Sequence, residues 1–120
     1  MACELAMKHM DAENTTVRAL RDKLEQGILS QISHCFPTGD VANRLPNTSN
    51  IAFEYIEGEA ILLLLNKLGI AASSGSACTS GSLEPSHVMR AMGIPYTAAH
   101  GTIRFSLSVY NTEDEVDRVI

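Results

Sequence analysis

Apolar residues recur at every third or fourth position near the start of the chain, which predicts a helix over residues 2 to about 32. The apolar side of this helix is formed by Val17, Leu20, Leu24 and Ile28. Asn14 and Thr15 interrupt the pattern in its first half. One long helix and two abutting helices therefore both fit the sequence.

Two short strands are predicted next, on either side of a polar loop. An apolar piece at residues 34–36 precedes the turn signature Pro-Thr-Gly-Asp. Residues 41–48 are polar and include Pro46, which predicts a loop. Residues 50–56 are rich in residues that favour β-structure, so we expect a strand there.

The segment 58–68 is predicted to be a helix that is apolar on nearly every side, because it contains four consecutive leucines. Such a helix is expected to be buried within a layer of the domain or against a partner domain. Gly69 follows as the residue that ends the helix in a left-handed conformation. Residues 70–72 are then expected to form a short buried strand.

The last third of the chain predicts a helix, a strand and a helix. Pro85 is expected to open the first of these helices, and Gly93 with Pro95 to close it. Residues 102–109 alternate between apolar and polar side chains, with Thr102 on the polar face, which predicts a half-buried strand. Thr112 and Glu115 have the spacing of a capping box, which predicts a final helix. This helix is cut off at residue 120, so we expect the chain to be a fragment.

The predicted order of elements is typical of an α/β or α+β sandwich, in which helices cover a small sheet. A chain of 120 residues has the size of one domain. A net charge of −5 argues against a nucleic-acid partner. The longest apolar run, residues 60–65, is far shorter than the roughly 20 residues that span a membrane. Three cysteines without a CxxC pair predict reduced thiols and a cytoplasmic protein.

Cys78 is the strongest candidate for a catalytic nucleophile, because it lies in a segment rich in glycine, serine and threonine at residues 73–82. A thiolate on a flexible loop is a nucleophile that can move between two places. His87 and His100 are candidates for its base. Two alternatives stay open: the segment is a solvated linker, or its backbone N–H groups bind an anion.

Arg104 occurs on the polar face of the predicted strand 102–109, where its planar guanidinium can bind a carboxylate through two hydrogen bonds. The alternative is a surface arginine paired with an acidic side chain. Cys3 and Cys35 are expected to be small buried hydrophobic residues. The three lysines are predicted to be solvated charges on helices; they are Lys8, Lys23 and Lys67.

Three segments of the chain resemble the cysteine desulfurases of the aminotransferase class V superfamily. The first is Arg-Leu-Pro-Asn-Thr-Ser-Asn-Ile-Ala-Phe from residue 44, with Glu-Gly-Glu-Ala-Ile-Leu-Leu-Leu-Leu from residue 57. The second is Ser-Ser-Gly-Ser-Ala-Cys-Thr-Ser-Gly from residue 73, with Glu-Pro-Ser-His-Val-Met-Arg-Ala-Met-Gly from residue 84. The third is His-Gly-Thr-Ile-Arg-Phe-Ser-Leu-Ser from residue 100. The resemblance is strongest to the NifS type, which serves nitrogenase.

This resemblance implies a reaction and roles for two residues. Such enzymes use pyridoxal 5′-phosphate to remove sulfur from L-cysteine and leave L-alanine. By the resemblance, Cys78 would take the sulfur as a persulfide and pass it to an iron–sulfur scaffold protein of the NifU type. Cys78 would then also be a possible iron–sulfur ligand shared with that scaffold. Arg104 would bind the carboxylate of the substrate.

The resemblance also implies that part of the enzyme lies outside this sequence. Family members are longer, and their large domain supplies the lysine, histidine and aspartate that hold the cofactor. None of the three lysines here lies in the family's lysine motif. We therefore expect residues 1–120 to be the C-terminal small domain, inactive alone, of an enzyme that is a homodimer. The alternative is a non-catalytic α/β binding or scaffold domain whose Ser/Gly loop docks an anion or a partner.

Overall fold

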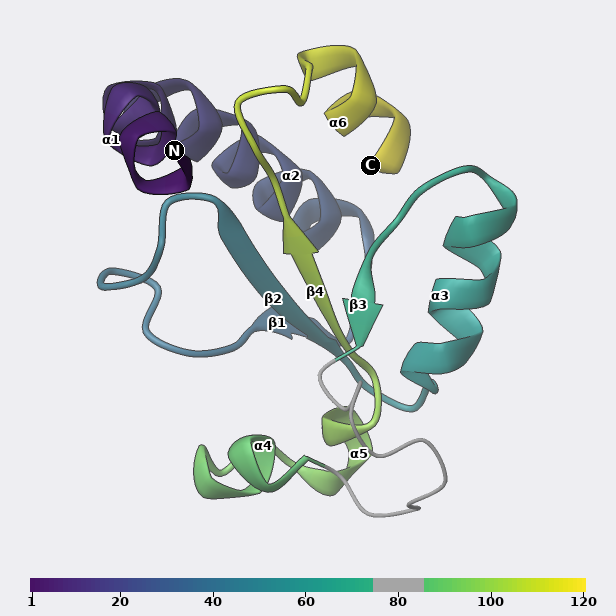
Figure 1. Cartoon of the computed structure of the whole chain (residues 1–120). Coiled ribbons are helices and arrows are strands. Elements are labelled where there is room, and N and C mark those ends of the chain that lie inside the picture. Colours follow the sequence, from purple (N-terminus) through teal and green to yellow (C-terminus); the bar gives the residue numbers. More distant parts are fainter. Residues whose placement is uncertain (75–85) are drawn as a thin grey trace.

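Helices cover a four-stranded antiparallel sheet in the computed structural model, which describes residues 1–74 and 86–120 (Figure 1). The strands lie in the order β1-β2-β4-β3. The elements in chain order are α1 (Ala2–Ala12), the π-helical turn η1 (Glu13–Val17), α2 (Arg18–Gln31), β1 (Cys35–Pro37), β2 (Thr48–Phe53), α3 (Gly58–Lys67), β3 (Ser73–Ser74), α4 (His87–Ala91), α5 (Tyr96–Ala99), β4 (Thr102–Ser106) and α6 (Glu113–Val119). The α/β class predicted from the sequence is confirmed.

The N-terminal helix is continuous, and η1 joins α1 to α2 without a break. Asn14 and Thr15 lie within η1. The Asn14 side chain donates to the carbonyl of Met10 at 2.9 Å, and the Thr15 hydroxyl donates to the carbonyl of Asp11 at 2.6 Å. Side chains that bond the preceding turn compete with the regular helix, which accounts for the local widening. Of the two arrangements that fitted the sequence, the single helix is correct.

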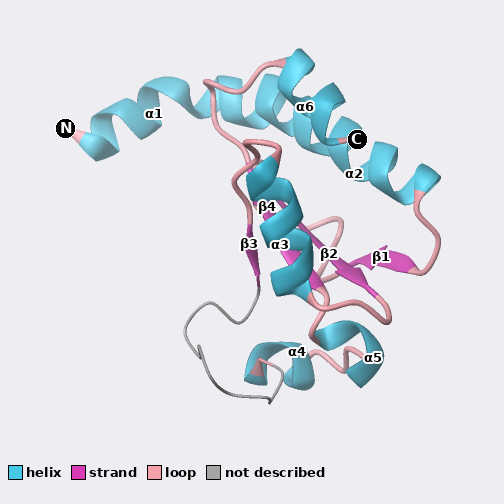
Figure 2. Ribbon diagram, turned by 90° about the vertical axis from the view of Figure 1, so that its right-hand side faces the viewer, coloured by secondary structure: helices cyan, strands magenta, loops and turns pink. Residues whose placement is uncertain are grey.

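The core lies between α2 and one face of the sheet. Ile51 of β2 and Ile103 of β4 are fully buried, and they pack with Leu24 and Ile28 of α2. Figure 2 shows α2 and α6 together above the sheet, with α4 and α5 below it and α1 extending away from it. The alternation predicted for residues 102–109 is confirmed at the apolar positions, because Ile103, Phe105 and Leu107 are buried.

Some details of the predicted strands are wrong. The strand predicted over residues 102–109 is β4, and it ends at Ser106. β2 begins at Thr48 and ends at Phe53, earlier than expected, because Tyr55 has a φ of 64° and turns the chain away from the sheet. Thr102 was expected on the polar face but is 2% exposed. Its hydroxyl donates to the carbonyl of Ala99 at 3.4 Å, which ties the start of β4 to α5.

The third strand begins further along the chain than predicted. Gly69 ends α3 with a φ of 75°, as expected, and the N–H of Ile70 donates back to the carbonyl of Leu65 at 2.9 Å. Residues 70–72 are therefore used to leave the helix and reach the sheet. Pairing begins only at Ser73, so β3 is a two-residue strand and is not buried.

Helix α3 is less buried than its leucines predicted. Gly58 is its only buried residue, although Ile61, Leu62 and Leu65 pack partly against the core. Leu63 and Leu64 are 65% and 60% exposed. Burial within a layer of this chain is thus wrong for the outer side of α3. Burial against a partner domain stays a prediction.

The described residues that precede β4, from residue 86 on, include two short helices, of which only one was predicted. Ser86 caps α4 by accepting from the N–H of Val88 at 3.3 Å, while Pro85 lies outside the described residues. Gly93 follows α4, but Pro95 does not close it; Pro95 is the N-cap of α5. A helix of four residues is too short to produce a periodic signal, so α5 could not be predicted.

Gly101 allows β4 to approach β2 closely. A Cβ atom at this position would lie 2.0 Å from the carbonyl oxygen of Phe53. The N–H of Phe53 donates to the carbonyl of Gly101 at 3.1 Å, so the two backbones are joined where they meet. Only glycine fits here, which gives this residue of the third resemblance segment a structural reason.

Helix α6 begins with the predicted capping box and packs against α2. The N–H of Glu115 donates to the Thr112 hydroxyl at 3.3 Å, and the N–H of Thr112 donates to the Glu115 carboxylate at 3.0 Å. Lys23 of α2 reaches Glu113 at 2.8 Å and Asp117 at 2.5 Å. In the part of the chain that the structure describes, no helix has both the length and the apolar character needed to cross a membrane.

Candidate functional site

The cysteines differ in their surroundings. Cys78 lies outside the described residues, and so does the predicted iron–sulfur ligation through it. Cys35 is half-buried, its thiol donates to the carbonyl of Ile32 at 3.2 Å, and burial raises the pKa of that thiol. A raised pKa makes a poor nucleophile near neutral pH. Cys3 is exposed, so its predicted burial is wrong, because α1 extends past the sheet and buries no residue.

Arg104 is an exposed residue in the middle of β4, and it is the only charged residue among the described residues of the four strands. Ile103 and Phe105, its neighbours in β4, point into the core, so Arg104 points away from α2. Among residues 1–74 and 86–120, no carboxylate lies within ion-pair distance of its guanidinium. The alternative of a surface arginine paired with an acid is therefore not observed in the described part.

Arg104 belongs to a row of polar residues that crosses the sheet. It pairs with Asn50 of β2 on one side and with Ser73 of β3 on the other. Thr38, which follows β1, extends the row, because its N–H donates to the carbonyl of Asn50 at 2.8 Å. Directly paired residues of antiparallel strands share one face of a sheet. We call Thr38, Asn50, Arg104 and Ser73 the Arg104 row.

Sequence reasoning missed Thr38 and Asn50. Thr38 was part of an expected turn and Asn50 of an expected strand. The two residues lie side by side only because segments that are far apart in the sequence pair in the sheet. The alternation in β4 identified the face of Arg104. Nothing in the local pattern around Thr38 or Asn50 indicated that they share this face.

The opposite side of β2 bears a second polar group, which holds the loop before β2. Arg44 donates two hydrogen bonds of 2.6 Å to the carboxylate of Glu25 on α2, and the Ser49 hydroxyl donates a third of 2.5 Å. The Arg44 guanidinium, helped by Ser49, holds the pKa of Glu25 below its usual range. This buried cluster attaches the first resemblance segment to α2, so Arg44 and Ser49 have structural roles.

The two histidines considered as bases lie on different elements. His87 is exposed at the start of α4. His100 is half-buried, and its ring makes an edge contact with Tyr96 at a centroid distance of 5.0 Å. Because Cys78 lies outside the described residues, the base that activates it stays a prediction.

The lysines do not fit a site for pyridoxal phosphate, which needs an amine that can be deprotonated to form an imine. Lys23 is held by Asp117 and Glu113, and these hydrogen bonds raise its pKa. Lys8 and Lys67 are exposed on α1 and α3. None of the described lysines is thus suited to a covalent bond with this cofactor. Lys8 and Lys67 are solvated helix charges as predicted, but the prediction is wrong for Lys23, which is half-buried and paired with two carboxylates of α6.

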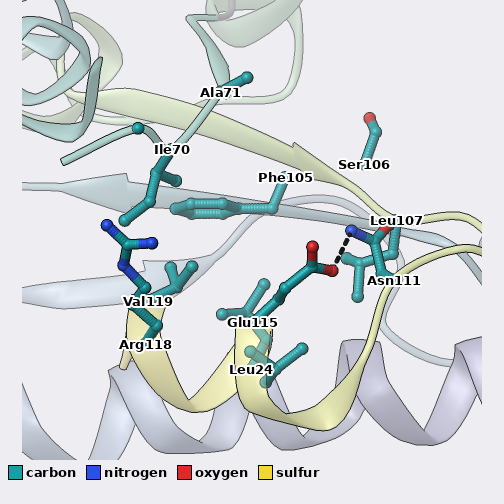
Figure 3. Close-up of a pocket in the computed structure, with 12 residues that line it drawn as sticks. Leu24, Ile70, Ala71, Phe105, Ser106, Leu107, Asn111, Glu115, Arg118 and Val119 are labelled. Carbon is teal, nitrogen blue, oxygen red and sulfur yellow. Dashed lines mark hydrogen bonds between the residues drawn. The ribbon is translucent and has the colours of Figure 1, made fainter. Parts of the chain in front are cut away.

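A cavity of about 350 Å³ lies between α6, α2 and residues 69–71 (Figure 3). Its charged side chains have structural partners: Glu115 accepts from Asn111 at 3.0 Å, and Arg118 donates to the carbonyl of Leu68 at 2.6 Å. Within the described ranges, no group of three His, Cys, Asp or Glu residues is placed to hold a metal ion. The Arg104 row is therefore the candidate site.

Comparison with known proteins gives consistent matches over almost the whole chain. The model of the family described as aminotransferase class-V matches residues 1–119. The cysteine desulfurase NifS of Azotobacter vinelandii is 78% identical over 120 residues, which are 100% of this chain and 30% of that protein.

Solved structures show the same fold. A NifS-like protein superposes with a TM-score of 0.80 at 32% identity, covering 97% of this chain and 28% of that one. A NifS-like protein from Rickettsia africae ESF-5 gives a TM-score of 0.79 at 26% identity, covering 95% of this chain and 29% of that one.

The chain spans about 30% of the length of these relatives. The predicted assignment to a C-terminal domain is not tested by these matches and stays a prediction.

Proposed function

Because the chain belongs to the aminotransferase class-V family, whose model matches residues 1–119, we propose that it is part of a cysteine desulfurase of the NifS type. In this proposal residues 1–120 form the small domain that bears the sulfur-accepting cysteine. The observation that supports it most strongly is 78% identity, over all 120 residues, to the cysteine desulfurase NifS of Azotobacter vinelandii.

The proposed reaction transfers one sulfur atom from L-cysteine to Cys78. The thiolate of Cys78 forms a new S–S bond as the carbon–sulfur bond of the substrate breaks, and the electron pair of that bond stays on the carbon skeleton. After protonation the carbon skeleton leaves as L-alanine. One thiol and one L-cysteine give one persulfide and one L-alanine, so the exchange needs no external oxidant.

Arg104 has the proposed role of binding the substrate's α-carboxylate. It is exposed on a sheet face whose other strand residues are neutral, and no described carboxylate neutralises it. A guanidinium binds a carboxylate through two parallel hydrogen bonds, which fixes orientation as well as position. Of the described residues in the four strands, Arg104 alone has the charge that this task requires.

Pyridoxal 5′-phosphate, when bound, supplies the electron withdrawal that makes sulfur loss from the substrate possible. Enzymes of this family generally use this cofactor. Because the lysines here do not fit its covalent site, we place that site in the rest of the parent protein. The contribution of this chain is then the thiol that accepts sulfur and the arginine that binds the substrate.

The later steps of the proposal concern the parent protein. The persulfide on Cys78 passes its sulfur to an iron–sulfur scaffold protein of the NifU type, for nitrogenase assembly, and Cys78 can share a ligand position with that scaffold. The parent acts as a cytoplasmic homodimer. The resemblance supports these steps. Cys35 is half-buried and Cys3 is exposed, so Cys3 is the better control for Cys78.

The test uses the full-length parent protein with its cofactor. We expect Cys78→Ala to reduce sulfide release from L-cysteine by roughly three orders of magnitude or more, because the nucleophile is lost. The matched control is Cys3→Ala, which removes an exposed thiol and should leave turnover unchanged. Mass spectrometry of the wild type should find the Cys78 peptide heavier by one sulfur atom.

Two outcomes would overturn the proposal. Full turnover in Cys78→Ala would show that this cysteine does not accept sulfur. Absence of sulfide release in the wild type would favour the alternative, a binding domain whose Ser/Gly loop docks an anion or a partner.

A further inference from the structure

Asn50 lies directly opposite Arg104 in the sheet, and its side chain has no role in the proposed reaction so far. The two residues are cross-strand partners. Their Cβ atoms are therefore about 5 Å apart on the same face. A ligand bound by the Arg104 guanidinium consequently lies within reach of Asn50.

The orientation of the Asn50 amide is fixed by Thr38, which is 7% exposed. The Thr38 hydroxyl donates to the main-chain carbonyl of Asn50 at 3.3 Å. Since its proton is used there, this hydroxyl can only accept from the Asn50 side chain, and Nδ2 of Asn50 donates to it at 2.6 Å. The amide nitrogen thus faces Thr38, and the carbonyl oxygen Oδ1 faces away from it.

Oδ1 of Asn50 is an acceptor without a hydrogen-bond donor among residues 1–74 and 86–120. Thr38 and Arg104 lie on opposite sides of Asn50 in the row, so Oδ1 is turned from β1 toward β4. A guanidinium has five N–H groups, and a carboxylate bound at two points uses two of them. A neutral acceptor beside it can hold a third N–H without neutralising the charge.

On the premise of the proposed function, we propose that Asn50, fixed by Thr38, is a positioning residue that holds the Arg104 guanidinium for two-point binding of the substrate carboxylate. An amide suits this task better than a carboxylate, because a carboxylate would pair with Arg104 and compete with the substrate. The proposal thus explains why this position combines an amide with a buried hydroxyl partner.

The test compares variants of the full-length, cofactor-loaded parent protein. Asn50→Ala removes the acceptor, and Asn50→Asp keeps the shape but adds a negative charge. Thr38→Val removes the hydroxyl and keeps the volume, so it frees the amide without emptying the site. The matched control is Ser106→Ala, which removes a hydroxyl from the same face of β4, two residues from Arg104.

We expect Asn50→Ala to raise KM for L-cysteine about tenfold with little change in kcat, the effect of losing one hydrogen bond to a charged group. Asn50→Asp should raise KM further than Asn50→Ala does. Thr38→Val should raise KM in the same direction by a smaller factor, and Ser106→Ala should leave it unchanged. The inhibition constant of L-alanine, which shares the carboxylate, should follow the same order.

A double variant separates positioning from a general structural effect. If Asn50 acts through Arg104, Asn50→Ala should add no further loss in an Arg104→Ala background. Additive losses would overturn the proposal, and so would equal KM values for Asn50→Asp and Asn50→Ala. If the Asn50 variants fail to fold, an unchanged KM in Thr38→Val overturns it. A wild type without desulfurase activity would instead contradict the proposed function.

Discussion

Glu25 is the residue that joins three separate parts of the chain. Its carboxylate, 8% exposed, accepts hydrogen bonds from Arg44 in the loop and from Ser49 in β2. Nearby, Arg21 of α2 donates to the carbonyls of Leu45 and Thr48 at 3.3 and 3.4 Å. Removing one partner of a buried ion pair lowers the free energy of unfolding strongly, whereas the intact pair itself contributes little to it. Glu25 therefore fixes where the loop lies, and with it the start of β2.

The ion pair of Glu25 predicts a specific dependence of stability on pH. Arg44 lowers the pKa of Glu25 from its ordinary value of 4.5, so the folded chain keeps this carboxylate ionised at lower pH than the unfolded chain does. Its stabilisation is complete above about pH 4.5 and is lost as the pH falls through the lowered pKa. Glu25→Gln should therefore cost about 3 kcal/mol near pH 7, and less in acid.

Urea unfolding at several pH values measures this difference. The matched control is Glu4→Gln, since the Glu4 side chain is 85% exposed and its loss should change the free energy of unfolding by less than about 0.5 kcal/mol. A gap between wild type and Glu25→Gln that is equally large near pH 3 and near pH 7 would contradict the prediction.

At the scale of elements, the sequence predicted those features of helices and strands that depend on neighbouring residues. The capping box of α6 and the apolar alternation of β4 depend on residues within a few positions of one another, and both are confirmed. The position of β3 and the shared face of Asn50 and Arg104 depend on pairing across the sheet. The exposed leucines of α3 are a similar case. An apolar composition predicts that a helix is buried, but it does not predict which surface covers the helix.

The capping box gives a prediction at this scale. Thr112→Ala removes the acceptor of the Glu115 N–H and should lower the free energy of unfolding by about 1 kcal/mol. Thr112→Ser keeps a hydroxyl and should retain most of the stability. The midpoint of urea unfolding measures both variants. Equal losses in the two would mean that the hydroxyl does not cap α6.

At the scale of the whole molecule, the proposed carboxylate-binding arginine and the covalent site of the cofactor are assigned by our proposal to different parts of the parent protein. The described residues provide an unpaired arginine on an otherwise neutral sheet face, but no lysine that fits the cofactor. The family resemblance and the positions of the lysines led us to expect this division, which stays a prediction. The sequence could not predict the Arg104 row, since the row exists only once four distant segments are paired.

The chain by itself is therefore expected to be inactive. Mixed with pyridoxal phosphate and L-cysteine, it should release no more sulfide than buffer and show no absorbance band of a lysine-bound cofactor. The full-length parent protein under the same conditions is the positive control. A band that depends on Lys8, Lys23 or Lys67, together with turnover, would mean that this chain holds a complete site.

The close approach at Gly101 has a consequence for engineering. Because a Cβ atom there would lie 2.0 Å from the carbonyl oxygen of Phe53, any larger residue must push β4 away from β2, and Arg104 is only three residues further along. A library designed to change substrate preference should therefore keep glycine at position 101. Its diversity belongs at position 50, which pairs directly with Arg104 on the same face of the sheet.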